Sequence, residues 1–181
     1  MMRQRQAGDI LRYHTRPTLQ KQSVAAHTWN ILRIWVCVFP DVPVPLIAVL
    51  QHECGEIRTG DLLFEVKTIY PEVGEKIREL EEMELEDQSW PRPGELSADQ
   101  ILVLKLCDLL EMLEFALVEI RLGNLEGREI HSNVTTAMRN RRAAAERTGF
   151  GDLWQRAWKA REVMNVEHNE YLNWYRDRSV G

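Results

Sequence analysis

One short segment of the chain, from Gln51 to Asp61, is unusually dense in side chains that can bind metals or move protons. It contains His52, Glu53 and Glu56 before its terminal aspartate. In a helix, His52 and Glu56 share a face, and Glu53 lies about 100° around the axis from His52. Imidazole nitrogens and carboxylate oxygens are ligands of divalent transition metals. The segment therefore predicts a metal-assisted reaction. A hydrogen-bonded core histidine beside solvent-facing glutamates is the alternative that this segment alone leaves open.

Two further side chains of metal-binding type stand in apolar stretches elsewhere in the chain. His27 follows Val24-Ala25-Ala26, and Asp108 interrupts the apolar run from Ile101 to Leu113. A buried carboxylate without a partner costs several kcal/mol, so Asp108 needs a metal or an arginine beside it. The sequence leaves both partners open.

The elements that would position these side chains are predicted to be helices. Helical periodicity dominates, and no alternating run bounded by hairpin turns is convincing, so the expected fold class is all-α. Ser23 and Ser97 are the expected N-caps, and Gly60 and Gly123 the expected helix-ending glycines. The predicted helices cover residues 24–39, 45–58, 71–87, 98–122, 126–147 and 151–175, and irregular segments are expected near 62–70 and 89–94.

Length and composition restrict the class of protein. The 181 residues, 44% hydrophobic and 28% charged, are typical of one globular domain, expected to span residues 1–181. The net charge of −5 provides no overall field for a long nucleic acid. No apolar run is long enough for a membrane span or a secretory leader, so a cytoplasmic location is expected. Cys37, Cys54 and Cys107 lack metal-type spacing, and we expect them to be reduced core residues.

In order and spacing, the candidate residues resemble the HD-domain phosphohydrolases, whose pattern is H…HD…D. Here the pattern reads His27…His52-Glu53…Asp108. The resemblance is greater to the YfbR-like 5'-deoxynucleotidases and related phage dATP triphosphohydrolases, and it covers most of the first 120 residues. It implies a single-domain, all-α helical bundle of the HD type.

Several short motifs carry this resemblance, each weak alone but specific in order and spacing. An Arg-aromatic pair, Arg12-Tyr13, precedes His27 by fifteen residues. The other matching pieces are Gln22-Ser23-Val24-Ala25-Ala26-His27, His52-Glu53-x-x-Glu56-x-x-Thr59-Gly60-Asp61, Val66-Lys67 and Lys105-x-x-Asp108. The chain departs from the pattern where Glu53 replaces an aspartate, Tyr13 a tryptophan and Ala26 a glutamate.

The resemblance implies a role for each matching residue. His27, His52, Glu53 and Asp108 would hold a divalent transition metal such as Co, Mn, Zn, Fe or Ni, with Mg as a further option at the substrate phosphates. Glu56 would be the general acid/base. Arg12, Tyr13, Asp61 and Lys67 would bind the nucleotide, with Asp61 on the 3'-hydroxyl side of the sugar.

Two kinds of function follow from these expectations. The leading hypothesis is a phosphohydrolase acting on small 2'-deoxynucleotides, which releases phosphate from a monophosphate or triphosphate from a triphosphate. The alternative is a catalytically silent HD-like protein that binds a nucleotide or a partner, with Glu53 marking the loss of the metal. Related proteins form dimers or higher oligomers, so a homo-oligomer is expected.

Overall fold

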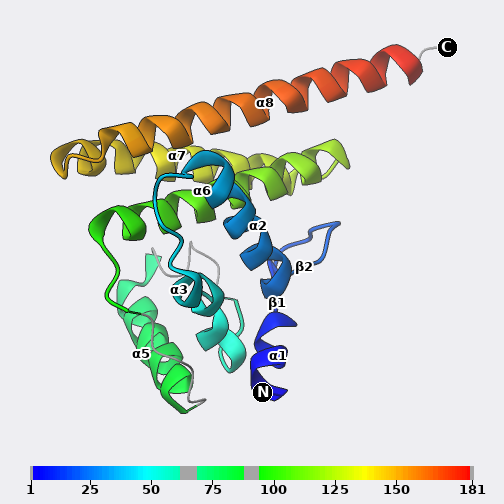
Figure 1. Cartoon of the computed structure of the whole chain (residues 1–181). Coiled ribbons are helices and arrows are strands. Elements are labelled where there is room, and N and C mark those ends of the chain that lie inside the picture. Colours follow the sequence, from blue (N-terminus) through cyan, green and yellow to red (C-terminus); the bar gives the residue numbers. More distant parts are fainter. Residues whose placement is uncertain (1, 62–68, 88–93, 180–181) are drawn as a thin grey trace. The chain divides into compact units, whose positions relative to one another are not determined.

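The described part of the chain folds into helices and one very small pair of strands, as a computed structural model shows (Figure 1). The structure describes residues 2–61, 69–87 and 94–179. They form two compact units, Met1–Leu32 with Val44–Leu96, and Arg33–Pro43 with Ser97–Gly181. The all-α expectation is confirmed. The expectation of one domain over the whole chain stays a prediction.

The first unit begins with α1 (Met2–Gly8), which the sequence analysis did not predict, and with two strands of two residues each. Strand β1 (Leu11–Arg12) pairs antiparallel with β2 (Gln22–Ser23), and Arg12 lies opposite Gln22. Strands this short leave no alternating pattern in a sequence. Helix α2 (Val24–Val38) follows β2 directly, and the Oγ of Ser23 accepts a hydrogen bond from the Ala26 N–H at 3.2 Å. The predicted N-cap at Ser23 is therefore confirmed.

The predicted helix over residues 45–58 is wrong in its second half. Helix α3 covers Leu46–Gln51, and a 3₁₀ helix, η1, covers Cys54–Ile57. Between them Glu53 has φ −120° and ψ 8°, which is outside the α-helical region. His52 and Glu56 therefore do not share one α-helical face. Gly60, with φ +70°, ends the segment in the left-handed conformation that glycine adopts readily.

Packing against α5 (Pro71–Asp87) accounts for this break. A Cβ built on Gly55 would lie 2.6 Å from the Cβ of Glu81 and 2.8 Å from its backbone oxygen. The backbone of η1 therefore approaches α5 more closely than any side chain would allow. Arg58 also forms an ion pair with the buried carboxylate of Glu84 on α5. Tertiary contacts of this kind override a helical sequence pattern.

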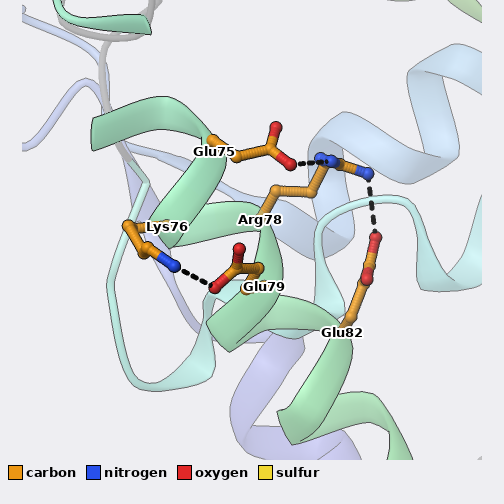
Figure 2. A network of polar contacts seen from close by, with 5 residues as sticks. All are labelled: Glu75, Lys76, Arg78, Glu79 and Glu82. Atoms are coloured by element: carbon orange, nitrogen blue, oxygen red, sulfur yellow. Dashed lines mark hydrogen bonds and ion pairs between the residues drawn. The ribbon is translucent and has the colours of Figure 1, made fainter. Parts of the chain in front are cut away.

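The charged run on α5 forms a solvated face, as predicted. Figure 2 shows Arg78 between Glu75 and Glu82, and Lys76 with its Nζ 2.7 Å from the Oε2 of Glu79. All of these pairs are spaced three or four residues apart on the helix. Exposed pairs of this kind each contribute about 0.3–0.5 kcal/mol. They stabilise the helix and have no evident role in chemistry.

The second unit consists mainly of α6 (Ala98–Arg121), α7 (Glu126–Arg147) and α8 (Gly151–Ser179), which pack against one another (Figure 1). Ser97 begins α6 with a capping box, in which its N–H donates to the Oε1 of Gln100 at 3.1 Å. Gly123, with φ +86°, follows its end. Arg156 on α8 donates to the Val38 carbonyl oxygen at 3.0 Å and forms an ion pair with Asp41. The predicted limits of α6 and α7 agree with the structure to within one residue, whereas α8 continues past the predicted end at residue 175 to Ser179.

Two of the three cysteines are core residues. Cys54 and Cys107 are buried, whereas Cys37 is exposed, so the expectation is wrong for Cys37. Burial, followed by the nearby carboxylates of Glu53 and Glu56, raises the pKa of the Cys54 thiol to about 11. The thiol is therefore protonated near neutral pH. Among the described residues, no helix has the length and apolar character needed to cross a membrane.

Acid should destabilise the second unit through His168. This side chain is 5% exposed on α8, and its Nδ1 accepts from the Nε of Arg121 at 3.1 Å. Burial, Arg121 and then His131 lower the pKa of His168. The unfolded chain therefore binds a proton at His168 more strongly than the folded chain does. The contribution of His168 to the free energy of unfolding falls as the pH drops through about 6.5. Between pH 7.5 and 5.5, urea unfolding should show a smaller loss of stability in His168→Gln than in the unchanged protein.

The loss of stability in acid can differ between His168→Gln and the unchanged protein by at most ~1.4 kcal/mol per pH unit, the value for one proton. His14→Gln replaces an exposed histidine and should keep the full acid dependence. An equal loss of stability in His168→Gln and the unchanged protein would contradict the assignment.

Candidate metal centre

Three of the four predicted metal ligands lie together within the first unit. His27 comes from the first turn of α2, and His52 and Glu53 come from the link between α3 and η1. One ligand atom from each lies within 4.8 Å of the others. The His27 and His52 rings stack with their centroids 6.1 Å apart. Residues separated by 25 positions in the sequence therefore meet at one point.

The spacing of these atoms suits a shared cation. The Nε2 of His52 lies 3.1 Å from the Oε1 of Glu53, and the Nε2 of His27 lies 4.0 Å from the same oxygen. Metal bonds of about 2.0–2.1 Å place neighbouring ligand atoms about 3 Å apart. The His52 Nε2 is buried and makes no hydrogen bond among the described residues. The donor set and its spacing are consistent with a divalent transition metal, and Glu53 fits despite its extra methylene.

The fourth predicted ligand, Asp108, belongs to the second unit. It lies in the middle of α6, half-buried beside the fully buried Cys107. Burial, and then Asp108, raises the pKa of the Cys107 thiol. The role of Asp108 as a metal ligand stays a prediction.

Arg12 orients the His27 ring. Its side chain is buried, and its guanidinium donates a hydrogen bond to the Nδ1 of His27. The β1–β2 pair brings Arg12 close to His27, because β2 leads directly into α2. At this junction the Val24 N–H donates a hydrogen bond to the Ile10 carbonyl oxygen at 2.8 Å. A guanidinium only donates, so Nδ1 accepts in this arrangement. A neutral ring that binds a cation through Nε2 carries its hydrogen on Nδ1, so Arg12 would release that nitrogen when a cation binds.

Tyr13 and Asp61 also meet within the first unit. The Tyr13 N–H donates to the Oδ2 of Asp61 at 2.9 Å, and both side chains are buried. Tyr13 has φ +56°, a left-handed conformation that is uncommon for a bulky residue and costs free energy. The Asp61 carboxylate stabilises this conformation. The sequence analysis missed this contact, because neither residue carries a local signal for the other across 48 positions.

Of the remaining predicted site residues, Glu56 lies within the described part of the chain and Lys67 does not. Glu56 is 2% exposed within η1, so it is not a surface glutamate. The Arg12 guanidinium carbon lies 5.5 Å from the centre of the Tyr13 ring. Lys67, together with Val66, lies outside the described residues.

Comparisons with known proteins identify the fold. No protein-family model matches the chain, and no curated protein matches it. Among solved structures, the chain is similar to the cyanophage S-2L HD phosphohydrolase DatZ, whose structure contains dA and one catalytic Zn²⁺ ion. The TM-score is 0.69 over 92% of this chain and 96% of that chain, at 18% sequence identity. The chain therefore has the fold of the HD phosphohydrolases, as its histidine and carboxylate pattern predicted.

Proposed function

We propose that this protein is a metal-dependent phosphohydrolase that acts on small 2'-deoxynucleotides. The observation that carries the proposal is the meeting of His27, His52 and Glu53, in the order expected for an HD pattern. Asp108 is the proposed fourth ligand, because Lys105-x-x-Asp108 matches the last ligand of the HD pattern in order and spacing. The solved HD phosphohydrolase with dA and Zn²⁺ supports both the metal and the substrate class.

A bound divalent cation would polarise a phosphate oxygen and lower the pKa of a water molecule. Glu56 is the proposed general acid/base. Its carboxylate is buried and follows His52 by four residues within the same compact segment. It would take a proton from the attacking water and return one to the departing oxygen.

The proposed substrate contacts are Arg12, Tyr13, Asp61 and Lys67. The Arg12 guanidinium carries a positive charge beside His27, which suits a phosphate group. The Tyr13 N–H donates a hydrogen bond to the Oδ2 of Asp61. We assign the Oδ1 of Asp61 as the acceptor for the sugar 3'-hydroxyl. The Tyr13 ring would pack against the sugar and disfavour a 2'-hydroxyl. Lys67 keeps its assignment from the sequence resemblance alone.

Replacing the proposed acid/base should separate metal binding from turnover. Glu56→Gln keeps the size and polarity of the side chain but cannot take up the proton. We expect kcat to fall by about 10²- to 10⁴-fold, with metal content and melting temperature nearly unchanged. Metal analysis, thermal unfolding and product release are the measurements.

The matched control is Glu72→Gln, which changes an exposed glutamate on α5 and should keep full activity. Turnover within a factor of two of the unchanged enzyme in Glu56→Gln would remove Glu56 from the mechanism.

The proposed function is tested with a panel of ribo- and deoxynucleotide mono-, di- and triphosphates, each assayed with Mn, Co, Zn and Mg. We expect a preference for deoxynucleotides, and the product identifies the reaction. Phosphate from a monophosphate indicates a 5'-deoxynucleotidase, and triphosphate from a triphosphate indicates a triphosphohydrolase. A purified protein without metal, and without turnover under any of these conditions, would instead indicate the catalytically silent binder. A homo-oligomer stays a prediction.

A further inference from the structure

A pocket lies between α7 and α8 in the second unit, formed by residues that the proposed reaction does not use. It is lined by Arg139 and Arg142 on α7 and by Trp154 and Trp158 on α8, and its volume is about 450 Å³. Pockets of about 300–1,000 Å³ suit small molecules. All four lining residues belong to one compact unit.

The walls of this pocket are two indole rings covered by guanidinium groups. Trp154 and Trp158, four residues apart on α8, stack with their centroids 5.2 Å apart and their planes at 19°. The guanidinium carbon of Arg142 lies 5.3 Å from the Trp154 ring centre, and that of Arg139 lies 5.8 Å from the Trp158 ring centre. A guanidinium stacked on an indole is held in place while its N–H edge stays available to an anion.

Positive charge accumulates at this pocket although the chain as a whole is acidic. Arg161 on α8 lies over the same Trp158 ring, 4.5 Å from its centre. Burial, and then the charge of Arg139, lower the pKa of Arg161, whereas Glu162 raises it. Two like charges near one ring repel each other, and a bound anion would relieve this repulsion.

The acidic side chains near the pocket compensate only part of this charge. Glu146 accepts a hydrogen bond from the Nε of Arg142 at 2.8 Å, but both side chains are more than half exposed. Glu162 accepts from the Nε1 of Trp158 at 3.1 Å. Among the described residues, Arg139 forms no ion pair within 4.0 Å. Its charge is therefore available to a ligand.

We propose that the pocket formed by Arg139, Arg142, Trp154 and Trp158 is a second binding site, which takes the phosphate chain of a small molecule. Guanidinium edges recognise phosphate oxygens in pairs. The volume exceeds the needs of a single phosphate ion and leaves space beside the indoles for the rest of the ligand. This site does not depend on the proposed metal centre.

Calorimetric titration of the His52→Ala protein without metal tests the proposal, since this background disables the candidate metal centre. The probes are inorganic triphosphate, dATP and the nucleoside deoxyadenosine. We expect one site per chain for a phosphate-bearing probe, with affinity that weakens as salt is added. Binding of dATP but not of inorganic triphosphate would identify a nucleotide as the ligand. Equal binding of both would identify the phosphate chain alone.

Arg139→Gln should weaken this binding by about tenfold or more, the effect of losing charge-assisted hydrogen bonds. Arg147→Gln removes the same charge from an exposed position near the end of α7 and should change the affinity by less than about twofold. Both positions are exposed, so both variants should fold. Equal weakening in the two variants, an absence of binding, or equally strong binding of deoxyadenosine would each overturn the proposal.

Discussion

His52→Ala is expected to abolish stoichiometric metal binding and to lower turnover by at least about 10³-fold, equivalent to about 4 kcal/mol of transition-state stabilisation. The Nε2 of His52 lies 3.1 Å from the Oε1 of Glu53 and faces the same point as His27. Removing the imidazole leaves two ligands from the first unit, too few to hold a cation tightly. Metal analysis of the purified variant and product release from deoxynucleotides measure the two effects.

The control is His131→Ala, which removes an imidazole that contacts the Oδ1 of Asn165 at 2.9 Å in the second unit. It should keep both the metal and the activity. Asp108→Asn provides a separate test of the proposed fourth ligand, and we expect it to weaken metal binding as well. Full metal content and full turnover in His52→Ala would disprove the metal centre. Loss in His52→Ala but not in Asp108→Asn would remove only Asp108.

Gly55→Ala is expected to lower the free energy of unfolding by about 1–3 kcal/mol or more, the cost of overpacking. The added Cβ would lie 2.6 Å from the Cβ of Glu81 and 2.8 Å from its carbonyl oxygen. Both atoms are close to the rigid backbone of α5, so neither can move aside without shifting the helix. His52 and Glu53 lie three and two residues before Gly55, and we therefore also expect weaker metal binding. Urea unfolding and metal titration are the measurements.

Gly94→Ala is the matched control for this substitution. It lies in the same unit, and a Cβ there would meet no atom of the described residues within 4 Å. Its stability should change by less than about 0.5 kcal/mol. If both alanine variants were equally stable, the close approach of η1 to α5 would not be a determinant of the fold.

The helices that are long, periodic and capped by local residues were predictable. The limits of α7 agree with the sequence pattern at both ends, and Ser23, Ser97 and Gly123 act at the helix ends as predicted. These signals are local, because a cap or a left-handed glycine satisfies backbone groups within a few residues. The same reasoning missed α1 and the two-residue strands, which are too short to show a period.

The chemical types of the candidate ligands, and the order in which they occur, were evident from the amino-acid sequence. Its resemblance to the HD pattern also implied that His27, His52, Glu53 and Asp108 could serve one cation. The geometry required long-range contacts: the approach of α5 to Gly55, which accompanies the break in the predicted helix, and the strand pair that brings Arg12 to His27. The Tyr13–Asp61 hydrogen bond is a third such contact. Such contacts depend on the packing of distant segments, and no pattern within a short window contains that information.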